Sequence, residues 1–129
     1  WVRRNPGLGE DLLNANPSYV FFRKLADLPA DKGPIGAMGR SITPLRSLAV
    51  DPAFTPLGAP VWIEKEGRVP MNRLMVAQDT GGAIKGAQRA DIFYGFGDAA
   101  GDAAGDVKDG GRMIILMPID RAYAMASDL

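Results

Sequence analysis

The chain has 129 residues, of which 47% are hydrophobic, and its 15 Lys and Arg residues balance its 15 Asp and Glu residues. This length and composition predict one compact domain, and the zero net charge argues against binding to nucleic acid or to an anionic membrane surface. Because the chain has no Cys and no His, disulfides, thiolate or histidine catalysis and the usual zinc sites are excluded, so acid–base chemistry falls to Asp, Glu, Lys or Tyr.

The first 46 residues predict little regular structure. We expect a short helix around Leu12 and Leu13, a break at Asn16-Pro17-Ser18 and then an extended segment. The density of Gly and Pro over residues 29–46 favours a loop that runs over the surface. The chain begins at Trp1 rather than Met, so we expect a processed or excised piece whose anchor or targeting segment lies upstream.

Residues 43–119 predict a small β-barrel. Short apolar runs predict five strands, of which the second and third form a hairpin, at residues 47–50, 60–65, 72–78, 89–94 and 112–119. The last of these is almost wholly apolar, so we expect it at the centre of the sheet. An Ala-rich stretch over 98–108 predicts one helix. We expect residues 1–42 to lead into the barrel and residues 120–129 to form a tail, frayed over residues 122–129.

Asp79-Thr80-Gly81 supports an alternative function. Asp-Thr-Gly is the core of aspartic proteases, in which two such loops share a proton between their carboxylates. A single copy in a chain of this size implies a homodimer of the retroviral type. The apolar residues before Asp79 fit that interpretation, whereas no later apolar segment ending in Gly is present to brace the loop. The protease therefore stays open as an alternative.

Asp91 is the most informative carboxylate. Strand alternation places it on one face with Phe93, and an apolar neighbour raises a carboxyl pKa and makes a usable general acid. The same alternation also places Arg89 on that face, where it would form an ordinary ion pair with Asp91. From spacing alone, the ion pair is the favoured interpretation.

Several ordered motifs together resemble one family. The most specific stretches are residues 78–86 (QDTGGAIKG), residues 89–93 (RADIF) and residues 95–97 (GFG). Earlier stretches with the same order are residues 16–23 (NPSYVFFR), 33–39 (GPIGAMG), 43–51 (TPLRSLAVD) and 56–62 (PLGAPVW). This pattern is similar to the C-terminal part of the membrane-bound lytic murein transglycosylase A family, whose three-aspartate domain corresponds to about residues 43–118.

The resemblance implies a fold and a set of site residues. The fold is a mainly β, six-stranded double-psi β-barrel with one or two short helices. Asp91 matches the catalytic acid/base and Asp79 matches a supporting aspartate, while Asp51, the third aspartate, is expected to be structural. Substrate contacts are expected at four positions, for which no metal or cofactor is needed: Gln78, Gly81, Gly82 and Lys85.

The resemblance also implies a reaction and a location. The reaction is non-hydrolytic cleavage of the β-1,4 bond between N-acetylmuramic acid and N-acetylglucosamine in peptidoglycan, which leaves 1,6-anhydromuramoyl ends. We expect an upstream domain to complete the substrate groove and the full-length protein to lie in the periplasm, anchored to the outer membrane. A non-catalytic barrel module that only binds glycan stays open as a further alternative.

Overall fold

The structure, a computed structural model, describes residues 1–18, 21, 23–29 and 31–127. These residues form one 3-10 helix, three α-helices and five strands, in the order η1 (Val2–Arg4), α1 (Pro6–Asn14), β1 (Ser47–Val50), β2 (Pro60–Lys65), β3 (Met71–Thr80), β4 (Ala90–Ile92), α2 (Asp98–Gly105), β5 (Gly111–Ile115) and α3 (Ile119–Ser127). The early helix is confirmed and ends before the Asn16-Pro17 break. The expected extended segment after this break includes residues 19, 20 and 22, which lie outside the described part.

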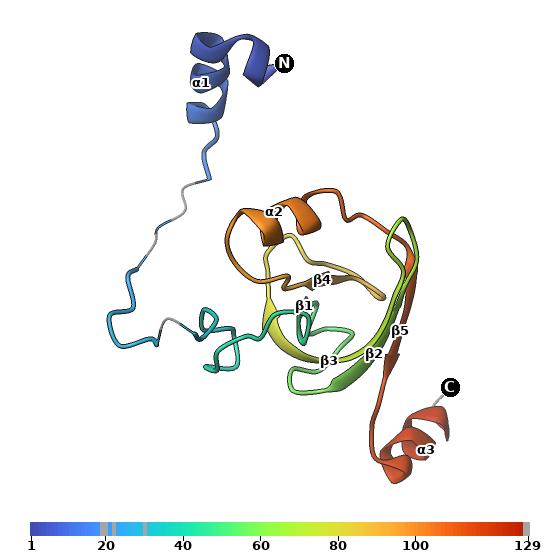
Figure 1. The fold of residues 1–129 in the computed structure, drawn as a ribbon. Helices are drawn as coiled ribbons and strands as arrows, with labels where there is room; N and C mark the ends of the chain where they lie inside the picture. The colour runs from blue at the N-terminus through green and yellow to red at the C-terminus, as the bar shows by residue number, and fades with distance from the viewer. Residues whose placement is uncertain (19–20, 22, 30, 128–129) are drawn as a thin grey trace.

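The five described strands form one sheet that curls into a half-barrel (Figure 1). Their order is β4-β1-β3-β2-β5, so β3 is the middle strand and β1 and β2 lie on either side of it. The β1–β3 pair is parallel, whereas β2 pairs antiparallel with β3 and β5, and β4 pairs antiparallel with β1. The expected β2–β3 hairpin is confirmed, and the sheet has five strands where the family resemblance implies six.

Alternation along the central strands builds the core. Val61 and Ile63 of β2 are buried, while Trp62 and Glu64, which alternate with them, face outward and are only partly buried. The inward side chains of β1, β2 and β3 form one cluster, whose members are Leu48, Val50, Val61, Ile63, Met75 and Ala77. Because these strands pair over most of their length, the core fixes their register and the positions of the residues that follow them.

The prediction of a central last strand is wrong. β5 lies at the edge of the sheet with only β2 beside it, and it ends at Ile115 rather than at residue 119. Its apolar residues are not enclosed on both faces, since Ile114 is 42% exposed. An unbroken apolar run is typical of a strand with two covered faces, and here one of those faces is open.

The prediction of a frayed tail is also wrong. Residues after Pro118 form α3. The N–H groups of Arg121 and Ala122 donate hydrogen bonds to the Pro118 carbonyl, and the alanines of this segment favour helix. α3 and α1 both extend away from the sheet (Figure 1). The expected helix over 98–108 is confirmed as α2, which ends earlier, at Gly105. None of the helices in the described ranges has the length and apolarity to span a bilayer.

Candidate functional site around Asp79 and Asp91

A β-bulge in β3 sets the direction of Asp79. Along β1, Leu48 lies opposite Ala77, but the next residue, Ala49, lies opposite Asp79, so Gln78 is the extra residue. A one-residue slip in register moves a side chain to the other face of a sheet. Without Gln78 as the bulge, Asp79 would turn toward the core side, so the bulge places its carboxylate on the face of Ala49.

Asp91 reaches the same face from the other side of β1. It also lies opposite Ala49, in the antiparallel β1–β4 pair. Since neighbouring strands are about 4.8 Å apart, the Cα atoms of Asp79 and Asp91 are about 10 Å apart. The two aspartates line one cavity of about 190 Å³ together with Ala49, Ser47 and Phe93, among others. The small side chain of Ala49 leaves the space between the carboxylates open.

Backbone N–H groups hold the Asp79 carboxylate. Its Oδ1 accepts hydrogen bonds from the N–H of Ala37 and from the N–H of Thr80, each at 2.9 Å. The loop that carries Ala37 comes this close because Gly36 has no side chain, since a Cβ there would lie 2.7 Å from the Gln78 carbonyl oxygen. In the described part of the chain no hydrogen bond to Oδ2 accompanies these two.

The side chain of Gln78 bonds Ser47, which lines the cavity. Its Oε1 accepts a hydrogen bond from the hydroxyl of Ser47, which in turn accepts one from the N–H of Thr43 at 2.8 Å. The carbonyl of Gln78 accepts a hydrogen bond from the N–H of Met38 at 3.2 Å. These contacts brace the bulge, and the expected contact of Gln78 with sugar stays a prediction.

Asp91 has both of the neighbours that the sequence indicates. The Nε and Nη2 atoms of Arg89 each lie 3.1 Å from Asp91 Oδ1, and the Asp91 side chain is 53% exposed. Phe93 lines the same cavity and packs edge-to-face against Phe96, with ring centroids 5.6 Å apart. The carboxylate is therefore positioned by a cation on one side and accessible to a substrate on the other.

Asp51 joins the loop that follows β1 to the loop that contains Gly86. Its side chain is nearly buried and accepts hydrogen bonds from the N–H of Gly86 at 2.8 Å and from the N–H of Ala53 at 3.1 Å. These two backbone bonds, with Gly86 the stronger, hold the pKa of Asp51 below its usual range. Burial opposes them, and the ammonium of Lys85, 3.9 Å away, adds a smaller lowering of that pKa.

The Gly-Gly loop has two unlike positions. A Cβ on Gly81 would lie 2.9 Å from the side chain of Ile84, which packs against this glycine. A Cβ on Gly82 would meet nothing within 4 Å, and Gly82 has no left-handed backbone conformation. Lys85 pairs with Asp51 and does not line the cavity between Asp79 and Asp91. In the described ranges no group of three or more acidic residues could hold a metal ion.

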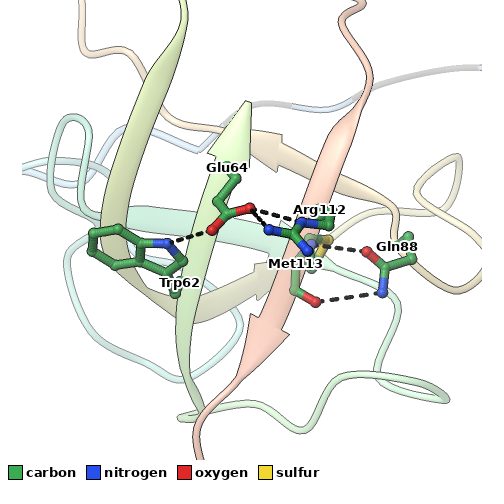
Figure 2. Close-up of polar contacts among 5 residues, drawn as sticks. All are labelled: Trp62, Glu64, Gln88, Arg112 and Met113. Carbon is green, nitrogen blue, oxygen red and sulfur yellow. Dashed lines mark hydrogen bonds and ion pairs between the residues drawn. The ribbon is translucent and has the colours of Figure 1, made fainter. Parts of the chain in front are cut away.

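A polar network next to the site has no counterpart in the sequence-based predictions. On the outer face of the sheet, Arg112 donates to Glu64 at 2.7 Å and Trp62 donates to Glu64 at 3.2 Å (Figure 2). The hydrogen bond from Arg112, aided by that from Trp62, holds the pKa of Glu64 below its usual range against the effect of burial. Gln88 bonds the backbone of Met113. The i, i+2 spacing of Trp62 and Glu64 predicts that they share one face of the strand. No local sequence pattern predicts the contact of Gln88 with Met113.

The chain matches the 3D domain family over residues 46–117. It is 34% identical over 126 residues to membrane-bound lytic murein transglycosylase A of Vibrio cholerae, a match that covers 88% of this chain and 32% of the relative. The chain therefore spans about a third of the length of the curated relatives that it matches.

Solved structures have the same fold at substantial identity. The lytic transglycosylase LtgG of Burkholderia pseudomallei is 50% identical, with a TM-score of 0.67 over 92% of this chain and 36% of that one. The transglycosylase MltA of Escherichia coli with bound chitohexaose is 34% identical, with a TM-score of 0.73 over 86% of this chain and 34% of that one.

Proposed function

The chain belongs to the 3D domain family, in the form found in membrane-bound lytic murein transglycosylase A, and on that premise we propose that the full-length protein is a peptidoglycan lytic transglycosylase. One observation carries the proposal beyond family membership. The β3 bulge and the β1–β4 pairing put Asp79 and Asp91 on one face, on either side of Ala49, in a shared cavity. Two carboxylates that flank an open space are the groups that glycosidic bond cleavage uses.

We assign the acid and base roles to Asp91. In its protonated form it donates a proton to the glycosidic oxygen between N-acetylmuramic acid and N-acetylglucosamine. The bond from that oxygen to C1 of the muramoyl residue breaks, and positive charge develops at C1 and its ring oxygen. The Asp91 carboxylate then takes the proton of the C6 hydroxyl as O6 attacks C1. The 1,6-anhydro ring closes, Asp91 regains its proton and no water is consumed.

Asp79 supports this reaction without transferring the proton. Its Oδ1 accepts hydrogen bonds from two backbone N–H groups, which hold the carboxylate in place on the cavity wall. A fixed negative charge on the same face as the reacting bond stabilises the positive charge that develops at C1. The hydrogen bond with Ala37 also joins the Gly-rich loop to the cavity wall. Asp79 therefore fixes the position of this loop and also supplies a negative charge to the site.

The proposed substrate is a peptidoglycan glycan strand. The MltA structure solved with bound chitohexaose, a saccharide, supports a saccharide ligand for a site of this fold. We propose that Gln78, Gly81, Gly82 and Lys85 contribute substrate contacts, with the open surface over Gly82 as the position that most favours a sugar. The remainder of the full-length protein completes the groove, since the chain spans only about a third of its relatives.

The barrel type and the cellular location are also proposals. The parallel β1–β3 pair within an otherwise antiparallel sheet supports a six-stranded double-psi barrel in the complete protein. The relatives are described as membrane-bound. That description supports a membrane anchor on the side where peptidoglycan lies, and the periplasm with an anchor in the outer membrane is the location that we propose.

Asp91→Asn in the full-length protein tests the assignment. The amide cannot take up and release the proton, so release of 1,6-anhydromuropeptides from purified sacculi, followed by mass spectrometry, should fall by at least about 10²-fold. Asp102→Asn, an exposed aspartate of α2, is the matched control and should leave the rate unchanged. Normal release by the folded Asp91→Asn protein would refute the role of Asp91.

A further inference from the structure

One side chain pairs with the free edge of β5, at Met113. β5 pairs with β2 on one side only, so its other edge presents unpaired backbone groups. The N–H of Met113 donates to Gln88 Oε1 at 2.8 Å, and Gln88 Nε2 donates to the Met113 carbonyl at 3.4 Å (Figure 2). The amide of Gln88 therefore pairs with both backbone groups of Met113, as a neighbouring strand would.

This pair of hydrogen bonds joins the two edges of the sheet. Gln88 lies two residues before β4, which forms the edge opposite β5. β4 has only three residues and pairs only with β1, so the segment leading into it depends on contacts outside the sheet. Gln88 itself has φ 60°, a left-handed conformation that is costly for a residue with a side chain. Its two bonds to Met113 offset that cost.

We propose that Gln88 is the positioning residue for Asp91, an inference that rests on the proposed transglycosylase function. Arg89, next in the chain, binds Asp91 Oδ1 through two nitrogens. Because the Asp91 side chain is half exposed, packing alone does not fix its carboxylate. Gln88, Arg89, Asp91 and Met113 all line one cavity of about 560 Å³. Fixing the backbone at Gln88 therefore fixes the base of Arg89, and Arg89 orients the carboxylate.

Two variants of the full-length protein separate positioning from folding. Gln88→Met keeps the length of the side chain and removes both hydrogen bonds. Gln88→Gly also removes them, but it relieves the left-handed backbone. Asn72→Met, an exposed amide on β3, is the matched control. The measurements are deuterium exchange at the Met113 amide, melting temperature, and kcat and KM on soluble glycan strands, with Asp91→Asn assayed in parallel.

We expect both Gln88 variants to exchange the Met113 amide faster and to lose about tenfold to a hundredfold in kcat. KM should stay within about twofold, because the loss concerns the reacting group rather than ground-state binding. Gln88→Gly should melt no lower than Gln88→Met and should still lose kcat. Unchanged exchange, unchanged kcat, or a rise in KM at constant kcat would each overturn the positioning role. An active Asp91→Asn protein would overturn the proposed function together with it, whereas an inactive one beside fully active Gln88 variants would overturn the positioning role alone.

Discussion

Ala49 is the residue whose enlargement best separates the site from the fold. It lies between Asp79 and Asp91 in register, and its side chain borders their cavity of about 190 Å³. Ala49→Val adds two carbon atoms to that space in a residue that favours strands. At about 0.8 kcal/mol per buried carbon, filling the cavity stabilises the fold by at most about 1.6 kcal/mol.

The effect on activity should be opposite in sign. The added methyl groups occupy the room between the carboxylates, where the scissile bond has to lie. We expect a loss of at least about tenfold in the release of 1,6-anhydromuropeptides. Overpacking costs typically about 1–3 kcal/mol in a filled core, but the open cavity removes most of that cost here.

Urea unfolding and digestion of sacculi, both on the full-length protein, measure the two effects. The urea midpoint of Ala49→Val should not fall below that of the unmodified protein, whereas its activity should. Ala49→Ser, which adds a single atom, is the matched control and should keep most of the activity. A folded Ala49→Val protein with full activity would show that substrate does not enter between the two aspartates.

The other two predictions concern Gly82 and Asp51. Gly82→Val should leave the melting temperature unchanged, because the position is open and its backbone is not left-handed, but it should raise KM for glycan strands if sugar lies there; an unchanged KM argues against contact. Asp51, whose pKa is lowered in the fold, contributes stability above its unfolded pKa of about 4, and this contribution is lost as the pH falls through the lower folded value. Thermal melts from pH 7 to pH 3 should therefore show Asp51→Asn less stable than the unmodified protein at neutral pH, with a difference in melting temperature that narrows as the pH falls. A difference that stays constant would contradict this.

Local signals in the sequence are sufficient to predict the strands that form the middle of the sheet. Alternation and turn residues predict β1, β2 and the hairpin to β3, because each has a buried face and a clear turn. They fail for β5, where an apolar run indicates burial on both faces although one face is open. They fail again after Pro118, where alanines form a helix without packing against the sheet.

The arrangement of the site is harder to predict from the sequence than the sheet is. Family motifs single out Asp79 and Asp91, but the reason they share a face is the bulge at Gln78. A bulge depends on how two strands pair, and those strands are distant in the chain. The bond of Gln88 to Met113 is equally non-local, since 25 residues separate the partners. Register and edge contacts of this kind become visible only once the strands are placed.

The central claim is that one aspartate cleaves the glycan with the sugar's own C6 hydroxyl as nucleophile. Digestion of purified sacculi by the full-length protein in H₂¹⁸O, followed by mass spectrometry of the muropeptides, tests it most directly. We expect 1,6-anhydromuramoyl ends that carry no ¹⁸O, because water takes no part in the step. New reducing ends labelled with ¹⁸O at C1 would show hydrolysis by water instead of attack by the C6 hydroxyl.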